Sequence, residues 1–293
     1  MKSDVIQPAA EAAATPTLGQ RLHVQSWLTP KWLITMLITL ILVVGEALYG
    51  VTGGYEKLAL VLGTCVMTEA VLSWFVLGKP PRIQSAYISG TSLTILLRPQ
   101  DGLLWPFVLG AFLSIASKYV LRYQGRHLWN PSNLGISLLL LLAPTQVALL
   151  SHEFGNALAA NLVIWGIGLM VVTRAKVVHV TLSYAGAFAV LAVLRSWIVG
   201  TPVLAELAPI TGPMYQLLCL FMLTDPATSG TTRRGRITAV IAIAVVECLF
   251  RLANDFDLPY AELVAPAPAI LALFFVGPLF FALDLRRKAR ASA

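Results

Sequence analysis

Charged residues are scarce in this chain of 293 residues. Only 12% are Asp, Glu, Lys or Arg, while 57% are hydrophobic; ordinary soluble domains carry about 25% charged residues. Long apolar runs recur from Trp32 to Leu283 with few gaps between them. This composition leaves no soluble domain of useful size, so any catalysis takes place in or at a membrane. We therefore expect a polytopic membrane protein.

Cysteines are also few, and their positions exclude a common class of site. Cys65, Cys219 and Cys248 all lie inside apolar runs, without a CxxC spacing and without a nearby histidine. Each is expected to be a small buried hydrophobic residue. The sequence therefore predicts no self-contained metal or iron–sulfur site, although a site shared with a partner subunit stays open.

The first 31 residues lack an apolar core. They combine Ala, Pro and Thr with scattered charges, and they form neither a cleavable signal peptide nor a membrane span. We interpret 1–31 as a mobile cytoplasmic tail, 32–285 as a ten-helix transmembrane domain and 286–293 as a basic cytoplasmic tail.

Ten apolar segments are candidate spans, because a helix needs about 20 residues to cross the bilayer. The third is short and rich in Ser and Thr, which is typical of a broken or re-entrant helix, and the start of the eighth is interrupted by Pro209 and Gly212-Pro213. We therefore predict an all-α polytopic fold with about ten transmembrane helices. The candidates are 32–50, 57–77, 86–98, 103–121, 132–150, 157–173, 178–199, 209–224, 237–253 and 263–283.

Lys and Arg are distributed asymmetrically over the loops between these spans. With the N-terminus in the cytoplasm, only four of the 21 fall on the outer side, as the positive-inside rule requires: Lys57, Arg98, Arg195 and Arg251. The same topology accounts for the net charge of +7 through attraction to anionic lipid, without nucleic acid. We predict a bacterial cytoplasmic (inner) membrane protein with both termini in the cytoplasm.

Ten spans also divide into two five-helix halves with broken helices, and such halves are inverted relative to each other. A weaker internal echo conflicts with this division. The segment 85–90 precedes Asn130-Pro131 by about the interval that separates 183–186 from Asp225-Pro226, so the echo pairs loops on the same side of the membrane. We favour the topology, and the duplication stays open.

The loop 125–133 is a polar and basic segment between two apolar ones. Asn130-Pro131 predicts a helix start capped by Asn130, because proline is favoured at the first helical position. Alternatively, Asn130 and Asn133 point into one cleft, where carboxamides pair with the imide edge of a flavin or a quinone carbonyl. Arg126 and His127 would then supply positive charge to a reduced ring.

A second polar loop, 224–236, has the same character. Asp225-Pro226 predicts a capped turn at the end of a span, where a carboxylate is costly. The basic residues Arg233, Arg234 and Arg236 either set the topology or, alternatively, accept the phosphate of a nucleotide-like cofactor or bind a partner subunit.

Three acids lie within the predicted spans. The spacing of Glu247 and Arg251 predicts an i,i+4 ion pair, and Glu46 lies near the outer end of its span. Glu69 has only apolar neighbours in sequence and is a functional candidate by default. Proton movement, pairing with a base and hydrogen bonding to Ser or Thr all stay open for it.

Two motifs together indicate a family. The run Lys118 to Ile136, with its Gly-Arg-His-Leu-Trp-Asn-Pro-Ser-Asn core, and the later Thr-Asp-Pro-Ala-Thr-Ser at 224–229 resemble the NqrB/RnfD family. Its members are membrane subunits of sodium-pumping NADH:quinone reductase and of the Rnf electron-transport complex. Tyr-Ile-Ser-Gly at 87–90 and Ser-Lys-Tyr-Val-Leu-Arg at 117–122 resemble most the RnfD-like branch called UnbU, found beside enediyne biosynthesis genes.

The resemblance covers most of 32–285 and implies a ten-helix fold, similar to urea transporters, that holds flavins and passes electrons within the membrane. Family members carry covalent FMN on the last Thr of Ser-Gly-Ala-Thr, which this chain lacks; the nearest run, 225–231, ends at Thr231. Since flavin transferase acts on the opposite side of the membrane, we expect noncovalent riboflavin or FMN instead. The candidate cofactor-binding residues are Arg126, His127, Asn130, Asn133, Asp225, Thr228 and Thr231.

Three functions follow as alternatives. The first is an electron-transfer subunit of a larger oxidoreductase, with membrane or redox partner subunits and a quinone or another membrane acceptor, in an enediyne-like natural-product pathway. The second is a small-molecule transporter or channel on the same fold. The third is a membrane scaffold for biosynthetic enzymes.

Overall fold

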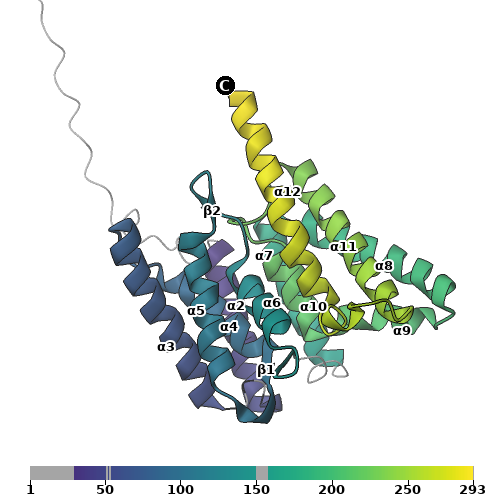
Figure 1. Ribbon diagram of the computed structural model, residues 1–293, viewed down its shortest axis with the longest axis horizontal. Coiled ribbons are helices and arrows are strands. Elements are labelled where there is room, and N and C mark those ends of the chain that lie inside the picture. Colours follow the sequence, from purple (N-terminus) through teal and green to yellow (C-terminus); the bar gives the residue numbers. More distant parts are fainter. Residues whose placement is uncertain (1–29, 51, 53, 150–157, 293) are drawn as a thin grey trace, which may run out of the picture.

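A computed structural model describes residues 30–50, 52, 54–149 and 158–292, and this part of the chain is mainly helical (Figure 1). The predicted tail over 1–31 lies outside the described residues, except for Pro30 and Lys31, which begin the first helix. The α-helices are α2 (Pro30–Tyr49), α3 (Tyr55–Leu72), α4 (Ile83–Leu96), α5 (Trp105–Val120), α6 (Pro131–Leu142), α7 (Leu158–Arg174), α8 (Val178–Val199), α9 (Val203–Leu207), α10 (Pro213–Leu217), α11 (Arg233–Asp255) and α12 (Pro268–Ser292).

Shorter elements extend some of these helices or lie between them. Two π-helical turns, η2 (Ser73–Leu77) and η5 (Leu218–Met222), extend α3 and α10, and 3-10 turns lie at η3 (Gln100–Gly102), η4 (Ala208–Thr211) and η6 (Ala261–Leu263). Two small antiparallel pairs complete the described structure. They join β1 (Leu97–Pro99) to β4 (Val147–Leu149), and β2 (Arg122–Tyr123) to β3 (Arg126–His127).

Some of the described helices have the length and composition of membrane spans. Four described helices are long and apolar enough to cross a bilayer: Tyr55–Leu77, Val178–Val199, Arg233–Asp255 and Pro268–Arg290. A fifth span results if the pair Val203–Thr211 and Met214–Met222, bent by 63°, counts as one. The all-α class is thus confirmed, and a helix lies in each of the ten predicted segments, but the number of ten spans stays a prediction.

Two predicted spans differ from the helices observed. The helix expected over 132–150 ends at Leu142, and the chain passes through a turn at 144–146 into β4. The reason is Pro144, since the residue before a proline is driven out of the helical region. The short third segment, expected as a broken helix, is α4, which ends at Leu96 and passes directly into β1. Because β1 pairs with β4, the ends of α4 and α6 are tied together.

The helices pack mainly within two groups along the chain. In the first half α3 packs against α4 and α5, and α5 packs against α6; in the second half α8 packs against α9 and α11, and α11 packs against α12. Contacts of α2 with α7 and of α6 with α12 join the halves. Helices α5 and α6 pack closely at Gly135, where a Cβ atom would collide with Ser114 Oγ and lie 2.6 Å from the Gly110 carbonyl.

One edge of the helical body carries the loops of interest. The β2–β3 hairpin and the C-terminal end of α12 lie at the upper edge in Figure 1, whereas β1 and α9 lie at the lower edge. Arg126 of the hairpin donates to the Pro226 carbonyl of the second polar loop at 2.7 Å. The two polar loops therefore meet at the same edge of the protein.

Candidate functional site

The two polar loops are joined by side-chain hydrogen bonds. Arg126 donates to the carbonyls of Pro226 and Ala227 at 2.7 and 3.1 Å, and its guanidinium lies 4.9 Å from the centroid of the Phe281 ring of α12. Asn130 Nδ2 lies 3.4 Å from Asp225 Oδ2. These contacts hold the start of α6 beside the turn that follows η5.

Asn130 and Asp225 also organise the backbone of their own loops. Asn130 Oδ1 accepts the Asn133 N–H at 3.2 Å and the Ser132 hydroxyl at 3.0 Å, so Asn130 is the cap of α6, as its position before a proline predicts. Asp225 accepts the Ala227 N–H and the Thr228 hydroxyl through its carboxylate oxygens. Asn130 Oδ1 and the Asp225 carboxylate are therefore already engaged in hydrogen bonds that stabilise their own loops.

A large cavity of about 420 Å³ lies directly beneath these loops. The volume falls in the range of about 300–1,000 Å³ typical of small-molecule sites. Apolar side chains from α2, α7 and η5 form one part of its walls, and polar residues of α4 and of the two loops form the rest. The polar lining consists of Arg82, Ser85, Ser89, Ser92, His127, Asn130, Ser132, Thr224 and Asp225.

Helix α4 supplies one polar wall of this cavity. Ser85, Ser89 and Ser92 follow one another at intervals of four and three residues, which places them on one helical face, and all three line the cavity. Ser89 donates its hydroxyl to the Ser85 carbonyl at 3.0 Å. Leu220 and Phe221 of η5 line the same cavity.

His127 lies at the loop end of the cavity and is half-buried. Burial lowers the pKa of its imidazole below the ordinary 6.5, and the positive charges of Lys118, Arg122 and Arg126 act in the same direction, while Asp225 opposes them. The ring is therefore neutral at neutral pH. A neutral imidazole carries one donor and one acceptor nitrogen, and among the described residues no hydrogen bond engages either of them.

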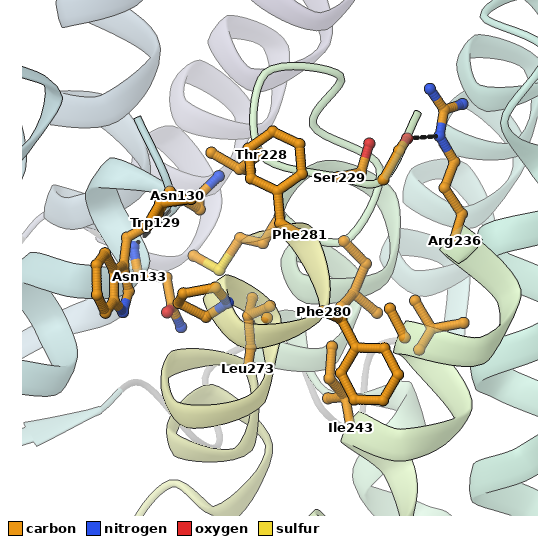
Figure 2. A pocket seen from close by; sticks show the side chains of 18 of the residues that line it. Trp129, Asn130, Asn133, Thr228, Ser229, Arg236, Ile243, Leu273, Phe280 and Phe281 are labelled. Atoms are coloured by element: carbon orange, nitrogen blue, oxygen red, sulfur yellow. Dashed lines mark hydrogen bonds between the residues drawn. The ribbon is translucent and has the colours of Figure 1, made fainter. Parts of the chain in front are cut away.

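A second, much smaller cavity of about 40 Å³ lies between α6, α11 and α12 (Figure 2). Asn130, Asn133 and Thr228 line it, but of the three only Asn130 also lines the large cavity. Asn133 is 1% exposed and donates its Nδ2 to the Ile270 carbonyl of α12 at 2.8 Å. The two carboxamides thus share the small cavity, which is too small for an aromatic cofactor.

The remaining residues of the second loop lie away from the large cavity. Thr231 donates its N–H and its hydroxyl to Asp284 Oδ2 of α12 at 2.5 and 2.6 Å. Arg236 donates to the Gly230 carbonyl at 2.6 Å, whereas Arg233 and Arg234 are exposed. Thr231 is therefore held against α12.

Glu69, the acid with no partner near it in sequence, is paired across the fold. Its Oε2 lies 3.3 Å from Lys118 Nζ of α5, and both side chains are buried. Its Oε1 accepts the Arg82 N–H at the start of α4 at 3.2 Å. Lys118 also donates to Ser85 Oγ at 3.1 Å. The sequence marked Glu69 as a candidate, but Lys118 and Ser85 were not identified because they are distant in sequence.

Glu247, the predicted intramembrane acid in the second half of the chain, forms a separate network. Glu247 is 1% exposed and lies 3.1 Å from Arg251, which confirms the i,i+4 pair expected from their spacing. Its carboxylate also accepts the hydroxyls of Tyr184 and Tyr215. Glu46, in contrast, is half-buried and accepts the Thr52 N–H at 2.7 Å.

The other sequence-derived expectations concern metals and cysteines. Cys65 and Cys219 are buried and Cys248 is half-buried, and all three are free thiols. Over the described residues, no group of three or more His, Cys, Asp or Glu side chains is placed to bind a metal ion.

No protein-family model matches the chain, and a comparison with curated proteins found no significant match.

Proposed function

We propose that the chain is a membrane subunit that binds a noncovalent flavin, riboflavin or FMN, in the large cavity and passes electrons within the membrane. The observation that carries the proposal is the convergence of both family-like loops on one cavity of about 420 Å³. The resemblance of these loops to the NqrB/RnfD family suggests the cofactor class, and with it a ten-span, urea-transporter-like arrangement. A bound flavin would supply one- and two-electron transfer.

The lining of the cavity fits a planar heteroaromatic ring. Such rings bind in mainly apolar pockets with a few oriented polar groups, and the walls from α2, α7 and η5 are apolar. His127 and Ser85 have hydrogen-bonding capacity that no described residue uses. Arg126, Asn130 and Asp225 hold the loops over the cavity, so their role toward a ligand is to shape its entrance.

The test is an absorption spectrum of detergent-purified protein from a flavin-replete host, before and after acid precipitation. Flavin bands that leave with the supernatant support the proposal. A colourless protein that stays colourless after incubation with riboflavin and FMN contradicts it.

A second candidate, transport, is favoured by the interrupted helices. The cavity is lined by the first turns of α4, whose other end passes into β1, and by η5, the end of the bent segment α9–η5. Transporters built from repeats place their substrate sites at such positions. Saturable substrate uptake into proteoliposomes without a redox partner would favour transport over electron transfer.

A further inference from the structure

The cavity wall formed by α4 contains one hydroxyl with an unusual environment. Ser85 Oγ lies 3.1 Å from Lys118 Nζ. Because an ammonium group only donates hydrogen bonds, the serine oxygen is the acceptor in this pair. The hydroxyl proton of Ser85 therefore points away from Lys118, and in the described part of the chain no acceptor binds it.

Lys118 itself is fixed in place. It is 9% exposed, and its ammonium group also lies 3.3 Å from Glu69 Oε2. Glu69 is in turn held by the Arg82 N–H, which belongs to the cap residue of α4. The orientation of Ser85 is thus set by a chain of contacts running from α4 through α3 to α5 and back to α4.

The pair has a physical consequence for a ligand. A hydroxyl that accepts a bond from a cation becomes a stronger donor, because hydrogen bonds in a chain polarise one another. The positive charge of Lys118 thus strengthens the hydrogen bond that the Ser85 hydroxyl can donate. Such a donor favours ligands whose acceptor oxygen carries or gains negative charge. A buried Lys–Glu pair is also a costly way to obtain stability alone.

We propose that Ser85, oriented by Lys118, is a ligand-contacting donor that recognises a carbonyl oxygen of the molecule bound in the large cavity. Lys118 and Glu69 are positioning residues and do not touch the ligand. This inference rests on the proposed function, since the ligand class it addresses is a planar ring with carbonyl acceptors such as a flavin.

The chain contains a matched control for this hydroxyl. Ser89 lies one turn further along α4 and lines the same cavity, but its hydroxyl is already donated to the Ser85 carbonyl. Removal of the Ser89 hydroxyl therefore changes the polarity of the wall without removing a free donor. Ser85→Thr keeps the hydroxyl and serves as the conservative variant.

The experiment measures riboflavin and FMN binding by the full-length protein in detergent, together with the carbonyl stretching bands of the bound flavin in difference infrared spectra. We expect Ser85→Ala to bind roughly tenfold more weakly and to shift one carbonyl band to higher frequency. Ser89→Ala should leave the carbonyl bands unshifted, since the Ser89 hydroxyl is already donated to the Ser85 carbonyl, and Ser85→Thr should restore both properties. The double variant Glu69→Gln/Lys118→Met avoids an unpaired buried charge and should reproduce the band shift.

Two outcomes separate the claims. If the unaltered protein binds flavin and Ser85→Ala binds it equally well with unshifted bands, the role of Ser85 is wrong while the proposed function stands. If the unaltered protein binds neither riboflavin nor FMN, the proposed function and the role of Ser85 are both overturned.

Discussion

The guanidinium of Arg126 donates to the main-chain oxygen of Pro226 at 2.7 Å, although the two residues are 100 positions apart in sequence. This contact joins the hairpin before α6 to the turn after η5, and the large cavity lies directly below it. A single side chain from one half of the protein thereby closes the site against a loop of the other half.

Loss of this contact should loosen the loops. Arg126→Ala removes two hydrogen bonds to carbonyls and the contact with the Phe281 ring, and we expect a destabilisation of about 1–3 kcal/mol. Reversible denaturation in detergent and limited proteolysis at 224–236 would measure it. Arg122→Ala is the control, because within the described residues the Arg122 side chain donates to the Gly125 carbonyl of its own hairpin and to no other group. Equal protease resistance of the Arg126 variant and the unaltered protein would contradict this account.

Asn133 is expected to matter for stability and not for the ligand in the large cavity. Asn133→Ala removes the side-chain hydrogen bond to the Ile270 carbonyl of α12 and the packing of a buried carboxamide, and we expect a destabilisation of about 1 kcal/mol. Flavin bound per folded protein should stay unchanged, as measured by absorption after removal of unfolded material. A stable Asn133→Ala protein that has lost its flavin would instead place this carboxamide at the cofactor.

The network around Glu247 should behave as a unit. Glu247→Leu leaves the half-buried Arg251 without its carboxylate and frees the Tyr184 and Tyr215 hydroxyls, and removal of one partner of a buried pair costs up to about 3–5 kcal/mol. Adding Arg251→Met should recover part of this loss in a double-mutant cycle. The interpretation is wrong if the effects of the two substitutions on the free energy of unfolding simply add.

The neutral imidazole of His127 predicts a pH dependence. Burial lowers its pKa below 6.5 in the folded protein, so below pH 6.5 the unfolded chain binds more protons than the folded one and stability falls with decreasing pH. Above this value the contribution is fully present. Denaturation midpoints of the unaltered protein and of His127→Gln, compared between pH 5 and 8, would test this, and the variant should show a smaller decrease at the acidic end.

The local parts of this structure were predictable from sequence, and the long-range parts were not. Asn130-Pro131 gives the cap of α6, and Glu247 with Arg251 gives an ion pair, because each depends on residues within one helical turn. The early end of α6 could have been read from Pro144. The partner of Glu69, in contrast, is 49 residues away, and the cavity depends on how α4, α7 and η5 come together. No local pattern encodes such packing.

The position of Asn133 shows the same limit. Its spacing from Asn130 places both carboxamides on one face of α6, as expected, and both line the small cavity. Which cavity that face meets is decided by the contact of α6 with α12, more than one hundred residues further along the chain.

The most direct measurement is the absorption spectrum of the purified protein before and after acid precipitation, with Thr231→Val alongside the unaltered chain. The account predicts flavin bands that appear in the supernatant for both proteins, since the Thr231 hydroxyl is bound to Asp284. Colour retained in the pellet by the unaltered chain and lost in Thr231→Val would contradict noncovalent binding. A protein without flavin bands, even after incubation with riboflavin and FMN, would contradict the central claim itself.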